Sequence, residues 1–147
     1  MTLRIHRRDA LWLIVSLAAA CRRAPVQRCA HCGMSISPTS RWRAGAETSS
    51  GPIAFDTPSC MVRYRFATPS HPLQNHWVIE YYGPANQRRD VREVRFVAGS
   101  RVVGPMGPDF VPVTLDHVAD FRRDHGGREA LPFDQLTQQS LGELTHP

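Results

Sequence analysis

The strongest constraint on the fold is an order of short segments that the sequence shows twice. In the first half, residues 40–47 and 52–55 are β-prone runs joined by the turn sequence TSSG. A helix is predicted over 58–66, because a capping threonine precedes it and a proline occupies its first position. The apolar run at 76–82 predicts a third strand, so this half has the order strand, strand, helix, strand.

The second half predicts the same order. Strands are expected at 94–100 and 110–113, with an irregular loop rich in proline and glycine between them, over 102–109. A helix is predicted over 114–126, between a capping threonine and a glycine, with apolar residues at helical spacing. Residues 129–133 predict the closing strand.

The fold class that follows is α+β, with two strand-strand-helix-strand (ββαβ) units. The halves share this order but no sequence identity. We place the first unit at 29–83, the second at 84–138 and a tail at 139–147. A chain of 147 residues accommodates one domain or two very small ones, and its 12 prolines and 10 glycines favour short elements.

The first 20 residues are predicted to be a targeting segment and not part of the fold. Arg4, Arg7 and Arg8 give a basic start, and an apolar run from Ala10 to Ala20 follows it. That run is too short to span a bilayer as a permanent helix. We therefore predict a signal peptide over 1–20 and export to the periplasm, where disulfides are permitted.

Cys21 directly follows three alanines and is predicted to carry a lipid. The surrounding sequence approximates a bacterial lipobox, and residues 21–28 are predicted to be a tether that leads to the folded part. Lipidation places the protein on the periplasmic face of the membrane. Ordinary signal-peptidase cleavage near Ala20 is the alternative.

The charge of the chain does not indicate a nucleic-acid partner. All 18 basic residues are arginines, and the formal net charge is +5. Without residues 1–20 the chain has 15 arginines against 12 acidic residues. These arginines are scattered among the acids, whereas a nucleic-acid-binding domain more often clusters its basic residues on one face.

The stretch CAHCGMSIS, residues 29–37, concentrates soft metal ligands. Cys29 and Cys32 could form a disulfide, a redox pair, half of a zinc site or part of a copper site. If Cys21 is lipidated, three thiols remain, and three cannot all pair within one chain. This odd number favours a metal site over a structural disulfide.

The neighbouring residues narrow the choice of metal. A zinc finger of the two-pair type needs a second ligand pair, and the sequence has no second Cys-x-x-Cys. A thioredoxin-type pair stands at the start of a helix, whereas Gly33 and Pro38 prevent a helix here. Met34 adds a thioether to the thiols, and such soft donors together select Cu(I).

Three more sulfur-bearing residues are candidates for this site. Cys60 falls at the third position of the first helix, where free N–H groups and the helix dipole stabilise a thiolate. Met61 lies next to it, although buried cysteines and methionines on a helix usually fill the core. Met106 lies on the loop rich in proline and glycine, where it either fills a core gap or faces a ligand.

As an ordered set, these motifs resemble the NosL-type accessory lipoproteins of nitrous oxide reductase. The similar stretches run from Cys29 to about Leu136 and are CxxCGM, FDTPSCM, FVAGS, GPMG, a helix ending in HGG, and LPFDQL. The resemblance implies two ββαβ units, similar to those of the organomercurial lyase MerB. It also implies a non-enzymatic, membrane-anchored periplasmic protein that binds Cu(I) and helps to metallate nitrous oxide reductase, its assembly complex or a related copper enzyme.

The candidate copper ligands fall into two ranks, since Cu(I) takes few donors and not all of them can bind at once. Asp56 is expected to cap or orient the loop, and His31 is a weaker candidate. The first rank is Cys32, Met34, Cys60 and Met106, and the second is Cys29 and Met61.

Two other interpretations stay open. One is a thiol–disulfide oxidoreductase or a MerB-like lyase, and the other is a structural lipoprotein with a Cys29–Cys32 or Cys32–Cys60 disulfide. The segment 83–93 is polar and charged where the NosL family tends to have a strand-like motif, so the copper recipient is less defined than copper binding. A copper site requires that the sulfurs of the CxxCGM stretch meet those of residues 60 and 106.

Overall fold

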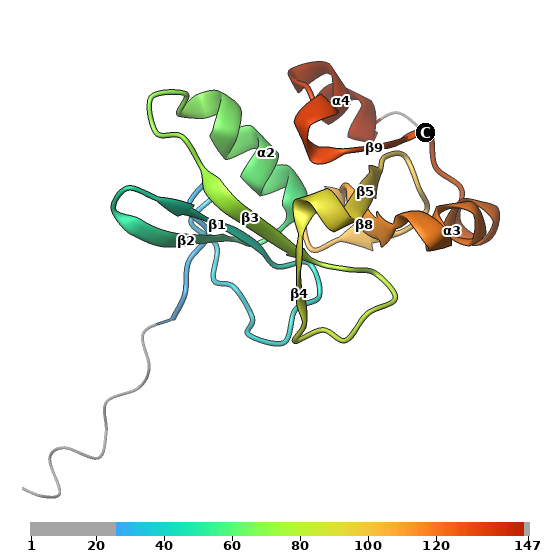
Figure 1. The fold of residues 1–147 in the computed structure, drawn as a ribbon, viewed down its shortest axis with the longest axis horizontal. Helices are drawn as coiled ribbons and strands as arrows, with labels where there is room; N and C mark the ends of the chain where they lie inside the picture. The colour runs from blue at the N-terminus through green and yellow to red at the C-terminus, as the bar shows by residue number, and fades with distance from the viewer. Residues whose placement is uncertain (1–25, 146–147) are drawn as a thin grey trace, which may run out of the picture.

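The structure is a computed structural model that describes residues 26–145 (Figure 1). Over these residues it contains three antiparallel sheets, of four, three and two strands, and three α-helices. The signal peptide predicted over 1–20 and the lipidation site Cys21 lie outside the described residues. Within 26–145, no helix is both long enough and apolar enough to cross a membrane.

The first unit builds a four-stranded sheet. Strands β1 (Ala44–Thr48) and β2 (Gly51–Phe55) form a hairpin, and α2 (Pro58–Ala67) then leads to β3 (Gln74–Ile79), which returns beside β1. A short strand, β4 (Arg88–Asp90), pairs with β3, and the sheet order is β2-β1-β3-β4. The polar segment 83–93 therefore contributes an edge strand to the first sheet.

The second unit repeats this arrangement. Strands β5 (Val94–Val97) and β8 (Val111–Thr114) pair, α3 (Val118–His125) follows, and β9 (Ala130–Leu131) pairs with the other side of β5. The order is β8-β5-β9, so the first strand lies between the second and third, as β1 does in the order β2-β1-β3. The α+β fold of two ββαβ units is confirmed.

The prediction of an irregular loop over 102–109 is wrong. Strands β6 (Val103–Gly104) and β7 (Gly107–Pro108) form a two-stranded hairpin there. Gly107 has a φ of 106°, in the left-handed region that glycine enters without a steric penalty, and this permits the reversal. Met106 lies in the two-residue turn between the strands.

The helix of the second unit begins later than predicted. A 3₁₀ turn, Leu115–His117, precedes α3, and Thr114 makes no side-chain cap to it. The Thr114 hydroxyl instead lies 3.1 Å from Nδ1 of His117 and hydrogen bonds with that ring. The predicted cap failed because this local side-chain contact competes with the helix N–H groups for the hydroxyl.

The C-terminal residues pack against the first unit. Helix α4 (Gln138–Gly142) lies beside α2, although the two are about seventy residues apart in the chain (Figure 1). Leu141 and Leu144 are buried in the main core. The described part of the segment 139–147 is therefore packed and not a free tail.

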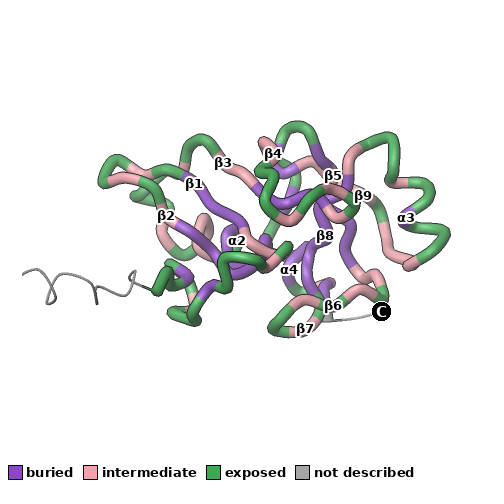
Figure 2. Tube along the Cα trace, turned by 90° about the horizontal axis from the view of Figure 1, so that it is seen from below, coloured by how far each residue is buried: buried purple, intermediate pink, exposed green. Residues whose placement is uncertain are grey.

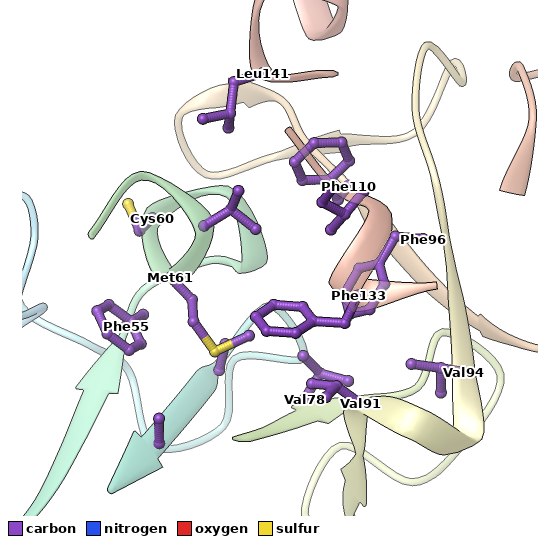
Figure 3. Packing of buried hydrophobic residues seen from close by; sticks show 14 of the residues in the cluster. Phe55, Cys60, Met61, Val78, Val91, Val94, Phe96, Phe110, Phe133 and Leu141 are labelled. Atoms are coloured by element: carbon purple, nitrogen blue, oxygen red, sulfur yellow. The ribbon is translucent and has the colours of Figure 1, made fainter. Parts of the chain in front are cut away.

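One main core extends through both units. Phe55 and Val78 of the first unit belong to the same buried cluster as Phe96 and Phe110 of the second (Figure 3). Figure 2 shows the buried chain continuing from β1 and β2 through α2 toward β8 and β5. A smaller cluster lies around Phe121 of α3. Because the units share a core, the position of α2 depends on both of them.

Candidate metal centre

Three thiols meet at the edge of the main core. The sulfur atoms of Cys29, Cys32 and Cys60 all lie within 4.8 Å of one another. Cys29 and Cys60 are only 3% and 4% exposed, whereas Cys32 is partly accessible. All three are free thiols. The site therefore has two buried sulfurs and one at the surface.

A tight turn presents Cys29 and Cys32 on one side. The Cys29 N–H donates to the Met34 carbonyl at 2.8 Å, and the Gly33 N–H donates to the Cys29 carbonyl at 2.9 Å. Gly33 has a φ of 75°, which a side chain would disfavour. The Ala30 N–H donates to the carbonyl of Ala54 in β2 at 2.9 Å, so the turn is fixed to the first sheet.

The start of α2 presents Cys60 to this turn. Thr57 is the N-cap and Pro58 follows it, as predicted, and the Thr57 hydroxyl accepts the Cys60 N–H at 3.3 Å. The residues of the first helical turn and a half, from Pro58 to Val62, are all buried. Cys60 thus enters the site from a rigid part of the fold, opposite a loop fixed by its own hydrogen bonds.

Cys29 and Cys60 share one proton. The Cys60 S–H donates to the Cys29 sulfur, and this bond is the main reason why the pKa of Cys29 is lowered from 9.0 to about 4. Main-chain N–H groups of Cys32, Asp56 and His31 add to the effect, and burial opposes it. The same bond, followed by burial, raises the pKa of Cys60. The lowered pKa of Cys29 and the raised pKa of Cys60 together favour a metal-free pair that holds one proton near neutral pH.

Asp56 lies beside the thiols without joining their cluster. It is buried, and its Oδ2 has no hydrogen-bond partner among the described residues. Burial and then the charge of Cys29 raise the pKa of Asp56. The cap of α2 is Thr57, and Asp56 contacts Cys29 through its main-chain N–H, which helps to hold the thiolate.

The methionines differ from the cysteines in position. Met61 is fully buried and its thioether points among Phe55, Val78 and Phe133, whereas the Cys60 side chain leaves the helix on another side (Figure 3). This is the core-filling role considered for it. Met34 and Met106 are 46% and 56% exposed. Their part in metal ligation stays a prediction.

A groove runs along the surface beside the cysteine turn. It has a volume of about 550 Å³ and lies between the cysteine turn, α2 and α4. His31 of the turn lines it and is exposed, with Arg63 and Phe66 of α2 on the opposite side. Another molecule therefore has access to His31, the residue before Cys32 in the turn.

The donor set fits a soft metal ion. Thiolates bind Cu(I), Zn²⁺ and iron–sulfur clusters, whereas Mg²⁺ and Ca²⁺ need oxygen ligands. Within the described residues, the only cluster of three or more cysteine, histidine or acidic side chains at metal-binding distance consists of these three thiols. A site with three sulfurs, one of them already ionised, suits an ion that accepts few soft ligands.

Sequence reasoning missed one part of this arrangement. The carboxylate of Asp109 reaches the start of α2 from the second unit and accepts the Ser59 N–H at 2.9 Å. Asp109 directly follows the GPMGP stretch that was singled out for its methionine. A polar residue next to an apolar strand was the available signal, but it did not indicate a partner 50 residues away.

The sequence matches the family model described as NosL over residues 22–141. The fold is similar to a crystal structure described as the copper chaperone NosL from Shewanella denitrificans, with a TM-score of 0.66 and 19% sequence identity. That match covers 80% of this chain and 98% of the other. A search of curated protein sequences gave no significant match.

Proposed function

This chain belongs to the NosL family, and we propose that it is an exported copper carrier that binds Cu(I) and passes it to a copper enzyme. The observation that supports this most directly is the meeting of three free thiols within 4.8 Å. The name of the similar structure, a copper chaperone, agrees with the same role. The bound ion is cargo in this proposal, and the protein carries it without catalysing a reaction.

The geometry suits transfer by ligand exchange. The buried pair, Cys29 and Cys60, holds the ion from the protein side, and Cys32 holds it from the accessible side. An incoming ligand can replace Cys32 first while the buried pair still binds the metal. Exchange of one ligand at a time avoids release of free copper. A site that allows such exchange suits a protein that transfers copper better than one that stores it.

Export and membrane attachment complete the proposal. The signal peptide at 1–20 and a lipid on Cys21 would keep the protein on the periplasmic face of the membrane. Nitrous oxide reductase or its assembly complex is the proposed recipient, on the basis of family membership. Mass spectrometry of the mature protein extracted from membranes tests the lipid and the copper count together.

The test of copper binding is a titration of the purified, reduced protein with Cu(I) against a chromophoric chelator. We expect about one tightly bound ion per chain and the loss of most of this affinity in the Cys32→Ser, Cys60→Ser double variant. Ser35→Ala is the matched control, because Ser35 is exposed on the same loop and carries no soft donor. Unchanged affinity in the double variant would contradict the proposed site.

The same preparations separate the alternatives. A thiol–disulfide oxidoreductase would turn over a model disulfide, and a MerB-like lyase would cleave an organomercurial. A structural disulfide would appear as two fewer titratable thiols, with a large loss of stability on reduction. Any of these results without copper binding would replace the carrier role.

A further inference from the structure

The metal-bearing end of α2 is held by a residue of the other unit. Asp109 is 3% exposed, and its Oδ1 accepts the N–H groups of Ser59 at 2.9 Å and of Phe110 at 2.8 Å. Its Oδ2 accepts the Ser59 hydroxyl at 2.6 Å. Hydrogen bonds to a buried carboxylate are stronger than those between neutral groups. Asp109 thus binds a main-chain N–H that the first turn of α2 leaves free.

Two hydroxyls connect this carboxylate to Cys60. Thr57 Oγ1 lies 3.0 Å from the Ser59 hydroxyl and accepts the Cys60 N–H at 3.3 Å. Because the Ser59 hydroxyl donates its proton to Asp109, the Thr57 hydroxyl donates to the Ser59 oxygen. Two hydroxyls, those of Ser59 and Thr57, therefore link Asp109 to the Cys60 main-chain N–H.

A second contact between α2 and the other unit does not reach the thiols. Arg65, more than a turn further along the helix, donates to the carbonyls of Phe133 and Leu136. It joins the same two parts of the fold as Asp109 does. Within the described residues, no hydrogen bond or ion pair links Arg65 to any of the three cysteines. Variants of Asp109 and Arg65 can therefore separate an effect on the stability of the fold from an effect on the position of the Cys60 thiol.

We propose that Asp109 is a positioning residue of the metal centre, which fixes the Cys60 sulfur opposite Cys29 by way of Ser59 and Thr57. The proposal rests on the metal site proposed above. It assigns the second unit, which contributes no cysteine, a role in metal binding: its carboxylate sets the geometry of a ligand in the first unit. A ligand that is held in place loses less conformational freedom when the ion binds.

The test uses two readouts, one of which needs no copper. In the metal-free protein, the alkylation rates of Cys60 and Cys32 are measured by peptide mass mapping. We expect Asp109→Ala and Thr57→Val to raise the Cys60 rate relative to Cys32 by about tenfold or more, because the lost hydrogen bonds release the buried thiol. Arg65→Met, which removes the other tie, should leave this ratio within about twofold.

In the second readout, the affinity for Cu(I) should fall about tenfold in the same two variants and stay near wild type in Arg65→Met. Asp109→Asn and Thr57→Ser should recover most of the affinity, because each keeps an oxygen at the required place. Thermal unfolding of every variant reports the fold. If Asp109→Ala does not fold, Thr57→Val carries the test, since it leaves Asp109 bound to Ser59.

Two results would overturn the proposal: Arg65→Met changing both readouts as much as Asp109→Ala does, or Thr57→Val and Asp109→Ala changing neither. Failure of the copper proposal has a different signature. The wild-type protein would then bind no Cu(I), while the alkylation ratio would still show whether Asp109 positions Cys60.

Discussion

The shared proton of Cys29 and Cys60 predicts a specific dependence of copper affinity on pH. Cu(I) binds thiolates, so any proton on a ligand must leave when the ion binds. Since Cys29 is ionised above a pKa of about 4 and the pKa of Cys60 is raised, the pair gives up one proton across the neutral range. Two ordinary thiols with a pKa of 9.0 would give up two.

The Cys32→Ser variant isolates this pair. Serine keeps the main-chain N–H that helps to stabilise the Cys29 thiolate, and it removes the third sulfur. Release of one proton raises the affinity about tenfold per pH unit, so from pH 5 to 7.5 it should increase by roughly 300-fold, equal to about 3.4 kcal/mol. Release of two protons would give roughly 10⁵-fold. Below the Cys29 pKa of about 4, the slope should increase by one proton.

The assay is competition with a chromophoric Cu(I) chelator whose own protonation is known at each pH. The variant His31→Gln in the same background is the control, because it removes the imidazole between the two cysteines of the turn and keeps the Cys29–Cys60 pair. It should leave the slope unchanged. A slope of two protons would refute the shared proton, and a flat profile or lack of binding would refute the pair as the buried half of the site.

Three further predictions concern the core, the thiols and the first sheet. Met61→Leu should leave the Cu(I) affinity unchanged, because the thioether points into the core. Met61→Ala should lower the free energy of unfolding by about 2–5 kcal/mol in urea denaturation. A large loss of Cu(I) affinity in Met61→Leu would instead make Met61 a ligand. Glutathione disulfide should oxidise one pair of thiols in the metal-free protein, with two glutathione molecules taking up the hydrogens, because sulfurs within 4.8 Å need only a small shift to bond. After this oxidation, one of the thiols of residues 29, 32 and 60 should still react with a thiol reagent. Bound Cu(I) should prevent the oxidation by glutathione disulfide. Three reactive thiols after the treatment would contradict the clustering of the sulfurs. Gly45→Ala should lower the free energy of unfolding by about 1–3 kcal/mol in urea denaturation, because a Cβ there would lie 2.5 Å from the Trp77 ring. Equal denaturation midpoints of the variant and the wild-type protein would show that the ring can move aside.

Much of the fold was predictable from local signals. Thr57 and Pro58 fixed the start of α2, and turns rich in glycine and proline separated the strands, so the two ββαβ units followed from the element order. The hairpin at 103–108 was missed, since strands of two residues leave no periodicity to detect. Thr114 showed the limit of a cap signal, because its hydroxyl found a partner in a side chain.

The site was predictable only in part, because its final geometry depends on contacts distant in the chain. The spacing of Cys29 and Cys32 and the helix-start position of Cys60 identified the thiols. Sequence neighbours on a helix face different directions, about 100° apart, which is why Met61 enters the core while Cys60 does not. The contact between Asp109 and Ser59 spans 50 residues and has no local signature.

The thiol turn lies at the very start of the described fold, only a short length of chain from the proposed lipid site. Eight residue steps separate Cys21 from Cys29. Even fully extended, such a length of chain reaches only about 26–29 Å. If Cys21 carries the proposed lipid, the metal stays within a thin layer above the bilayer. The search for a recipient then becomes a two-dimensional one, and an acceptor held at the same membrane is met far more often than one that diffuses freely through the periplasm.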